Sequence, residues 1–257
     1  MSFSDRKSAS SMIGVLIFGL VAWLVVRIFW AGGFENFFVP GAALENEIVA
    51  ELEAYPGNHV LLSRLEADFP KAYEDLKETL GRAARSAGPE NRILVAANQW
   101  VVRFFASHDR DFAAAPIANL DTVMELEQNF LEALRDHDEY ACAAYAKAEP
   151  QDRPLPESFD IMGGEIVGSR ISAIQAGRGD QQLRLGLSQL DYDALTETLR
   201  SNGLNDAQID VVYGEAEPGS IGAPLACEMA IELVRAIRAQ PEEPRALLIG
   251  RYVSGAE

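Results

Sequence analysis

The chain has 257 residues, a formal net charge of −17 and two cysteines. Such acidity argues against a nucleic-acid-binding protein, because neutralising phosphates requires a basic face. It also argues against flat electrostatic binding to anionic lipid. The charge keeps a domain soluble, and its field would attract basic peptides, cationic proteins or divalent ions.

A nearly uninterrupted apolar run, residues 12–30, follows the basic pair Arg6 and Lys7. A helix of this length spans a hydrocarbon layer of about 30 Å. A cleaved signal peptide has a shorter apolar core, about 7 to 15 residues, that ends at small residues, whereas this run ends at large ones. We therefore predict a short cytoplasmic tail over residues 1–10 and an uncleaved transmembrane anchor over residues 11–31.

The flanking charges predict the orientation of this anchor, because Lys and Arg beside a span are retained on the cytoplasmic side. Only three of the 22 basic residues and one of the 39 acidic residues precede residue 31, so the rest carries a charge of −19. We expect an inner (cytoplasmic) membrane protein with a juxtamembrane connector at residues 32–41 and an exported domain at residues 42–257. That domain would be periplasmic in a Gram-negative host and extracellular otherwise.

Beyond the connector, apolar residues recur at helical spacing. A first helix is expected to end near Pro56, and Asn58 is placed to cap a short second helix. Pro70 marks the start of a third helix, which ends near Gly88.

The strongest apolar stripe after the anchor lies in residues 93–105. We expect this helix at the centre of the core. A long helix is predicted over residues 120–148, and the polar, proline-bearing stretch 149–157 is the candidate boundary between two lobes.

The next helix restarts at Ser158 and contains Gly164 and Gly168, whose spacing would permit close approach by a neighbouring helix. Residues 181–190 alternate briefly between apolar and polar, as a strand does. Because no second convincing strand is available to pair with them, a short helix is favoured.

Residues 191–214 predict a helical hairpin, in which Gly203 supplies a left-handed C-cap and Asn205 starts the second helix. Pro224 opens a further helix, and a last helix follows Pro244. The expected fold class is all-α: one transmembrane helix followed by an exported domain of about eight to ten helices, as one unit or two lobes.

Cys142 and Cys227 both follow the predicted anchor. An even pair in an oxidising compartment predicts one disulfide, and two buried free thiols are the alternative. Closing a loop of about 85 residues would stabilise the fold by at most about 4.5 kcal/mol in the chain-entropy model. Neither cysteine lies in C-x-x-C or near a histidine, so redox or nucleophilic catalysis is not indicated.

The sequence contains no phosphate-binding pattern of the forms G-x-x-x-x-G-K-[ST] or G-x-G-x-x-G, and no G-x-S-x-G elbow. We therefore predict no nucleotide and no cofactor. Two clusters, His108 with Asp109 and His137 with Asp138, could offer nitrogen and oxygen ligands to a hydrolytic metal if the fold brought them together. The alternative is a polar helix-end turn and a solvated helix face.

Glu157 and Ser158 follow the proline-rich stretch. This dipeptide resembles the Glu-Ser signature of the lysozyme-like lytic transglycosylases, helical exported enzymes that act on peptidoglycan, and residues 186–190 (GLSQL) are similar to that family's Gly-Leu-Met-Gln segment. The spacing differs, the methionine is missing, and no small-residue turn precedes the segment. The resemblance implies Glu157 as a catalytic acid kept protonated by apolar surroundings. Alternatively, Ser158 caps a helix whose dipole stabilises the Glu157 carboxylate.

The main functional hypothesis is a single-pass membrane-anchored protein whose exported helical domain is an interaction module, subunit or regulator of a cell-envelope complex. One alternative is the peptidoglycan-active enzyme using Glu157. Another is a carrier for a small apolar or cationic ligand, with Trp100, Phe104 and Phe105 as one wall of an interhelical pocket. The same aromatic residues would otherwise belong to the core.

Overall fold

The computed structural model describes residues 42–86, 92–147, 149, 155–182, 184, 186–214, 216 and 221–254. All regular structure in these residues is helical, which confirms the all-α class. The predicted tail, anchor and connector, residues 1–41, lie outside the described residues. Within the described part of the chain, no helix is long and apolar enough to cross a membrane.

Twelve helices occupy the described residues, more than the eight to ten expected. Their bounds are α2 Ala42–Glu53, α3 Pro56–Asp68, α4 Pro70–Arg85, α5 Arg92–Ser107, α6 Asp109–Ala113, α7 Ile117–His137, α8 Glu139–Ala146, α9 Glu157–Gly179, α10 Gln189–Ser201, α11 Asp206–Val212, α12 Ala223–Arg238 and α13 Glu242–Ser254.

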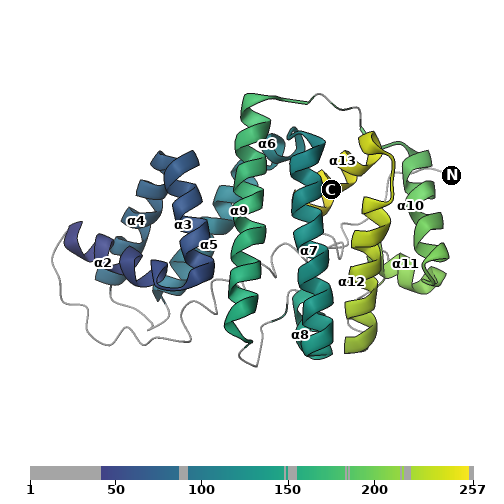
Figure 1. Cartoon of the computed structure of the whole chain (residues 1–257), viewed down its shortest axis with the longest axis horizontal. Helices are drawn as coiled ribbons and strands as arrows, with labels where there is room; N and C mark the ends of the chain where they lie inside the picture. The colour runs from purple at the N-terminus through teal and green to yellow at the C-terminus, as the bar shows by residue number, and fades with distance from the viewer. Residues whose placement is uncertain are drawn as a thin grey trace.

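Helix α9 is the central element of the fold (Figure 1). It packs against α3 on one side and against α6 and α7 on the other. Helices α2, α4 and α5 lie with α3 on one side of α9, whereas α12 lies beyond α7 on the other side, with α10 and α11 outermost. Helix α8 packs against both α7 and α12. The expectation that residues 93–105 form the central helix is therefore wrong. Their stripe is buried, but α5 packs mainly against α4.

Glycines on α9 let it approach its neighbours closely, as the spacing predicted. A Cβ added at Gly164 would lie 2.5 Å from the backbone oxygen of Gly57 on α3, and one added at Gly168 would lie 2.8 Å from the Val60 side chain. At the other end of α9, a Cβ on Gly177 would lie 1.8 Å from the Asp111 backbone oxygen on α6. These contacts join the second half of the chain to the first.

The predicted helix over residues 120–148 is two helices, α7 and α8. Asp138 between them has extended backbone angles, and its carboxylate accepts a hydrogen bond from the Tyr140 backbone N–H at 2.9 Å. This side-chain cap satisfies a free donor at the start of α8. The break turns α8 towards α12 and carries Cys142 to its partner.

Three local expectations differ from the structure. Asn58 does not cap α3, which begins at Pro56; its side-chain amide instead donates to the Leu52 carbonyl at the end of α2 (3.1 Å). Residues 181–190 do not form a short helix, because the described residues among them stay irregular until Ser188 caps α10. Pro244 lies in the first turn of α13, where its missing N–H is tolerated.

The predicted hairpin is confirmed: Gly203 has φ of +99°, and Asn205 caps α11. Apolar side chains from before and after residues 149–157 belong to one hydrophobic cluster, for example Phe130 and Ile166.

The predicted disulfide is also confirmed. Cys142 on α8 and Cys227 on α12 are bonded, with their Cα atoms 5.3 Å apart, and both side chains are fully buried. The bond fixes α8 against α12 in the part of the core that also contains Tyr145 and Phe130, whose rings meet edge to face.

Removing this bond by the double substitution Cys142→Ala and Cys227→Ala is expected to lower the free energy of unfolding by about 2–4 kcal/mol. The unfolded chain gains freedom when a loop of 85 residues is no longer closed. Urea unfolding of the isolated protein measures the loss, and reduced wild type is the control that should match the variant. Equal stability of oxidised wild type and variant would contradict the prediction.

Candidate functional site

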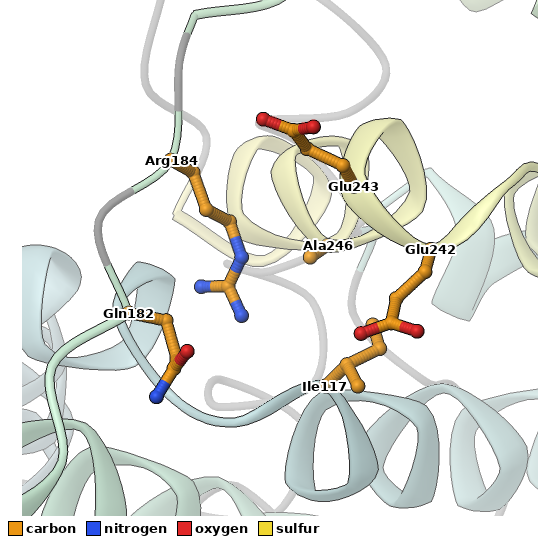
Figure 2. A pocket seen from close by; sticks show the side chains of 6 residues that line it. All are labelled: Ile117, Gln182, Arg184, Glu242, Glu243 and Ala246. Atoms are coloured by element: carbon orange, nitrogen blue, oxygen red, sulfur yellow. The ribbon is translucent and has the colours of Figure 1, made fainter.

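A polar surface hollow of about 200 Å³ lies where three segments meet (Figure 2). The first turns of α13 contribute Glu242, Glu243 and Ala246, the start of α7 contributes Ile117, and the irregular segment before α10 contributes Gln182 and Arg184. The hollow is thus built from parts of the chain that are far apart in sequence.

Arg184 fixes one wall of the hollow. Its guanidinium donates to the backbone oxygens of Ala113 and Ala115 at 2.5 and 2.6 Å. The backbone N–H of Gln182 donates to the backbone oxygen of Ala114 at 2.8 Å. Three successive carbonyls, from the last residue of α6 into the turn before α7, are satisfied in this way. Burial lowers the pKa of Arg184, and the nearby carboxylates of Glu242 and Glu243 oppose that change.

The hollow offers a ligand both donors and acceptors. Each Nη atom of Arg184 donates one hydrogen to a carbonyl oxygen and keeps a second N–H, whereas Glu242 and Glu243 carry exposed carboxylates. Acidic residues in the first turn of a helix are favoured by its dipole. The two carboxylates can accept from a hydrogen-bond donor with positive charge, such as an ammonium or guanidinium group, on the side of the hollow opposite Arg184.

A second polar cluster lies inside the core, around Glu127 on α7. This side chain is only 7% exposed. Its Oε1 accepts hydrogen bonds from the hydroxyl of Tyr145 on α8 at 2.8 Å and from that of Tyr252 on α13 at 3.4 Å. Burial raises the pKa of Glu127, and the tyrosine hydrogen bonds and the charge of Arg170 partly offset the rise.

Arg170 on α9 is the buried cation of this cluster and is 5% exposed. Its guanidinium lies 4.5 Å from the centre of the Phe105 ring, and Nη2 donates to the Val253 carbonyl on α13 at 3.3 Å. Its Nε has no hydrogen-bond partner among the described residues. Burial lowers the pKa of Arg170, while Glu127 raises it. The cluster joins α7, α8, α9 and α13.

Asp109, at the start of α6, is a half-buried carboxyl whose charge also acts on Arg170. Burial raises its pKa to about 6, although Arg170 and His108 oppose the change. Because the pKa of Asp109 is higher in the folded than in the unfolded protein, its protonation stabilises the fold. This stabilisation is complete below about pH 3.8 and is lost as the pH rises through about 6.

The substitution Asp109→Asn is therefore expected to stabilise the protein at pH 8 by about 1–2 kcal/mol, and to have little effect near pH 4. This stabilisation is smaller than the free energy that corresponds to the whole pKa shift, because solvent partly screens the carboxyl. Urea unfolding at both pH values measures it, with Asp111→Asn on the same helix as the charge-matched control. Equal effects of Asp109→Asn at the two pH values would refute the interpretation.

The candidate metal ligands lie on separate elements. The His108 ring packs against Phe104 and Phe69, with centroid distances of 4.6 and 5.3 Å, and the His137 ring packs 5.4 Å from that of Phe159 at the start of α9. Asp109 begins α6, and Asp138 caps α8. Within the described residues, no group of three His, Cys or carboxylate side chains is placed to hold a metal ion.

Glu157 is exposed at the first position of α9, with Pro156 before it. The expected helix cap by Ser158 is not formed, since Ser158 lies inside the first turn. The positive end of the helix dipole remains available to the Glu157 side chain. Among the described residues, this exposed side chain is not enclosed by the apolar surroundings that a catalytic acid needs.

The aromatic residues considered as a ligand-binding wall are core residues. Trp100 stacks on Phe104 at 5.3 Å, and Phe104 meets Phe105 edge to face at 5.4 Å. The Trp100 indole N–H donates to Asp75 at 2.7 Å. All three rings are buried against neighbouring side chains.

Glu127 and Arg170 are not among the residues predicted from the sequence, although the chain contains a signal for both. Glu127 continues the buried stripe of α7, three residues after Met124 and three before Phe130. Arg170 likewise lies between Val167 and Ile174 on the buried face of α9. A charged residue at a core position of an amphipathic helix indicates a buried polar partner.

Comparison with family models, curated proteins and solved structures finds no match.

Proposed function

We propose that this protein is held in the cytoplasmic membrane by residues 11–31, and that its helical domain lies outside the cytoplasm and binds another protein of the cell envelope. The observation that carries the proposal is the buried disulfide between Cys142 and Cys227. Disulfides persist in oxidising compartments and are rare in the cytosol. The basic pair before the apolar run supports the same orientation.

The charge of the domain supports a basic partner. An acidic protein attracts cationic surfaces over several ångströms and accelerates their encounter. The hollow adds two exposed carboxylates, Glu242 and Glu243, beside a wall that Arg184 fixes in place. A lysine or arginine side chain of a partner would pair with these two carboxylates.

Cross-linking in intact cells, followed by mild detergent extraction of the full-length protein, tests this function. A stoichiometric envelope protein should be recovered with the wild type, and less of it with the variant Glu242→Gln/Glu243→Gln. The matched control is Glu47→Gln/Glu51→Gln, which removes the same charge from exposed positions on α2. Repeated recovery of the wild-type protein alone would contradict the proposal.

A further inference from the structure

The last turn of α13 is attached to the core through buried polar groups. Tyr252 donates its hydroxyl to Glu127 on α7, and the Val253 carbonyl accepts a hydrogen bond from Arg170 on α9. The first part of α13 is held differently, by the ion pair of Arg245 with Asp121 near the surface (2.9 Å). Arg251 of the last turn also donates to the Tyr192 hydroxyl on α10 at 2.9 Å, so what distinguishes this end is its additional contact with buried Glu127 and Arg170.

We propose that the cluster of Glu127, Arg170, Tyr145 and Tyr252 is a pH-dependent latch for the C-terminal turn of α13. The turn stays docked when the Glu127 carboxyl is protonated and detaches more often when it is ionised. Because Arg245 and Asp121 remain paired, the movement is confined to the C-terminal part of the helix.

The direction of this dependence follows from what undocking does to Glu127. While α13 is docked, the carboxyl is enclosed, and the Arg170 guanidinium uses its one described hydrogen bond for Val253. Removing Tyr252 and Val253 would admit water to the carboxyl, which lowers its pKa towards the ordinary value. Undocking thus releases a proton, so rising pH favours it.

The charged and titratable groups that face Glu127 come from three helices. Tyr145 on α8 and Tyr252 on α13 have pKa values raised well above the ordinary value by burial, and Arg170 on α9 is a cation. Arg170 also interacts electrostatically with Asp109, which in turn interacts with His108. Among the described residues, Glu127 is the carboxyl that the last turn of α13 contacts directly, through the Tyr252 hydroxyl.

Hydrogen–deuterium exchange of the full-length protein tests the latch. The amides of residues 248–254, corrected for intrinsic exchange rates, should show an opening equilibrium that rises with pH by up to about tenfold per unit, then levels off. Amides in the middle of α9 should not follow this rise. A flat profile at residues 248–254, or the same rise throughout the domain, would overturn the proposal.

The variant Glu127→Gln should abolish the rise, because a carboxamide does not titrate. Glu125→Gln, an exposed position on the same helix, is the control and should keep it. Repeating the comparison in an Asp109→Asn background removes the other carboxyl near Arg170. A rise unchanged by Glu127→Gln would overturn the latch.

Tyr252→Phe keeps the apolar shape of the cluster and provides a test if Glu127→Gln does not fold. Loss of one hydroxyl donor to the carboxylate should raise the opening equilibrium about two- to tenfold at high pH, and less at low pH. The same increase at every pH would contradict a role for the ionised carboxylate.

Discussion

Replacing Gly164 by alanine is expected to destabilise the domain by about 3 kcal/mol, although alanine is the better helix former by about 1 kcal/mol. The added Cβ would lie 2.5 Å from the Gly57 oxygen and 2.6 Å from its Cα. Both are backbone atoms, so no side-chain rotation relieves the overlap, and α3 must move away from α9. Since α9 is the central helix, the neighbouring contacts are weakened as well.

Thermal unfolding measures this effect, and a fall of about 6–12 °C in Tm is expected for a domain of this size. Gly179→Ala is the matched control, because it makes the same change on the same helix at a position with no atom within 4 Å of the added Cβ. Similar Tm values for the two variants would show that the close packing of α3 on α9 is not required.

The substitution Glu127→Ala is expected to lower the free energy of unfolding by about 3–5 kcal/mol. It removes the acceptor for the Tyr145 and Tyr252 hydroxyls and, at a pH where Glu127 is ionised, also the negative charge that acts on the buried Arg170. Glu127→Gln should lower the free energy of unfolding by less, because the amide oxygen still accepts hydrogen bonds from the two tyrosine hydroxyls.

A double-mutant cycle separates the charge effect from the loss of packing. Glu127→Leu combined with Arg170→Met should be more stable than the sum of the two single variants predicts, because neither buried charge remains. Urea unfolding of the four proteins gives the coupling energy. Strict additivity would indicate that Glu127 and Arg170 do not interact.

Local signals in the sequence were enough to predict several parts of the fold. The hairpin of α10 and α11 depends on Gly203 and Asn205, whose effects act within a few residues. The close approach at Gly164 followed from the spacing of small residues on one helix face. The disulfide followed from an even pair of cysteines in a chain expected to be exported.

Other features depend on tertiary contacts that the sequence pattern does not contain. Apolar spacing continues through Asp138, so one long helix was predicted; the break becomes favourable only because α8 packs on α12 and Cys142 reaches Cys227. The strand-like stretch before α10 is neither strand nor helix, because Arg184 ties it to the turn between α6 and α7.

The candidate sites were the least predictable part. The hollow combines Ile117, Arg184 and Glu242, residues whose proximity only the folded chain establishes. The interior cluster was easier to predict from the sequence, since Glu127 and Arg170 interrupt apolar stripes. By contrast, His108 and His137 were candidates because each lies next to an aspartate, and Glu157 because of a two-residue resemblance; the structure places all three at helix ends.

The most direct measurement of the central claim is a pair of reporter fusions to the last residue of the full-length chain. A phosphatase that requires export for its disulfides should be active, and a fluorescent protein that matures only in the cytosol should be dark. Membrane fractions should contain both fusions. The opposite pattern, with a bright cytosolic reporter and an inactive phosphatase, would contradict an exported domain anchored through residues 11–31.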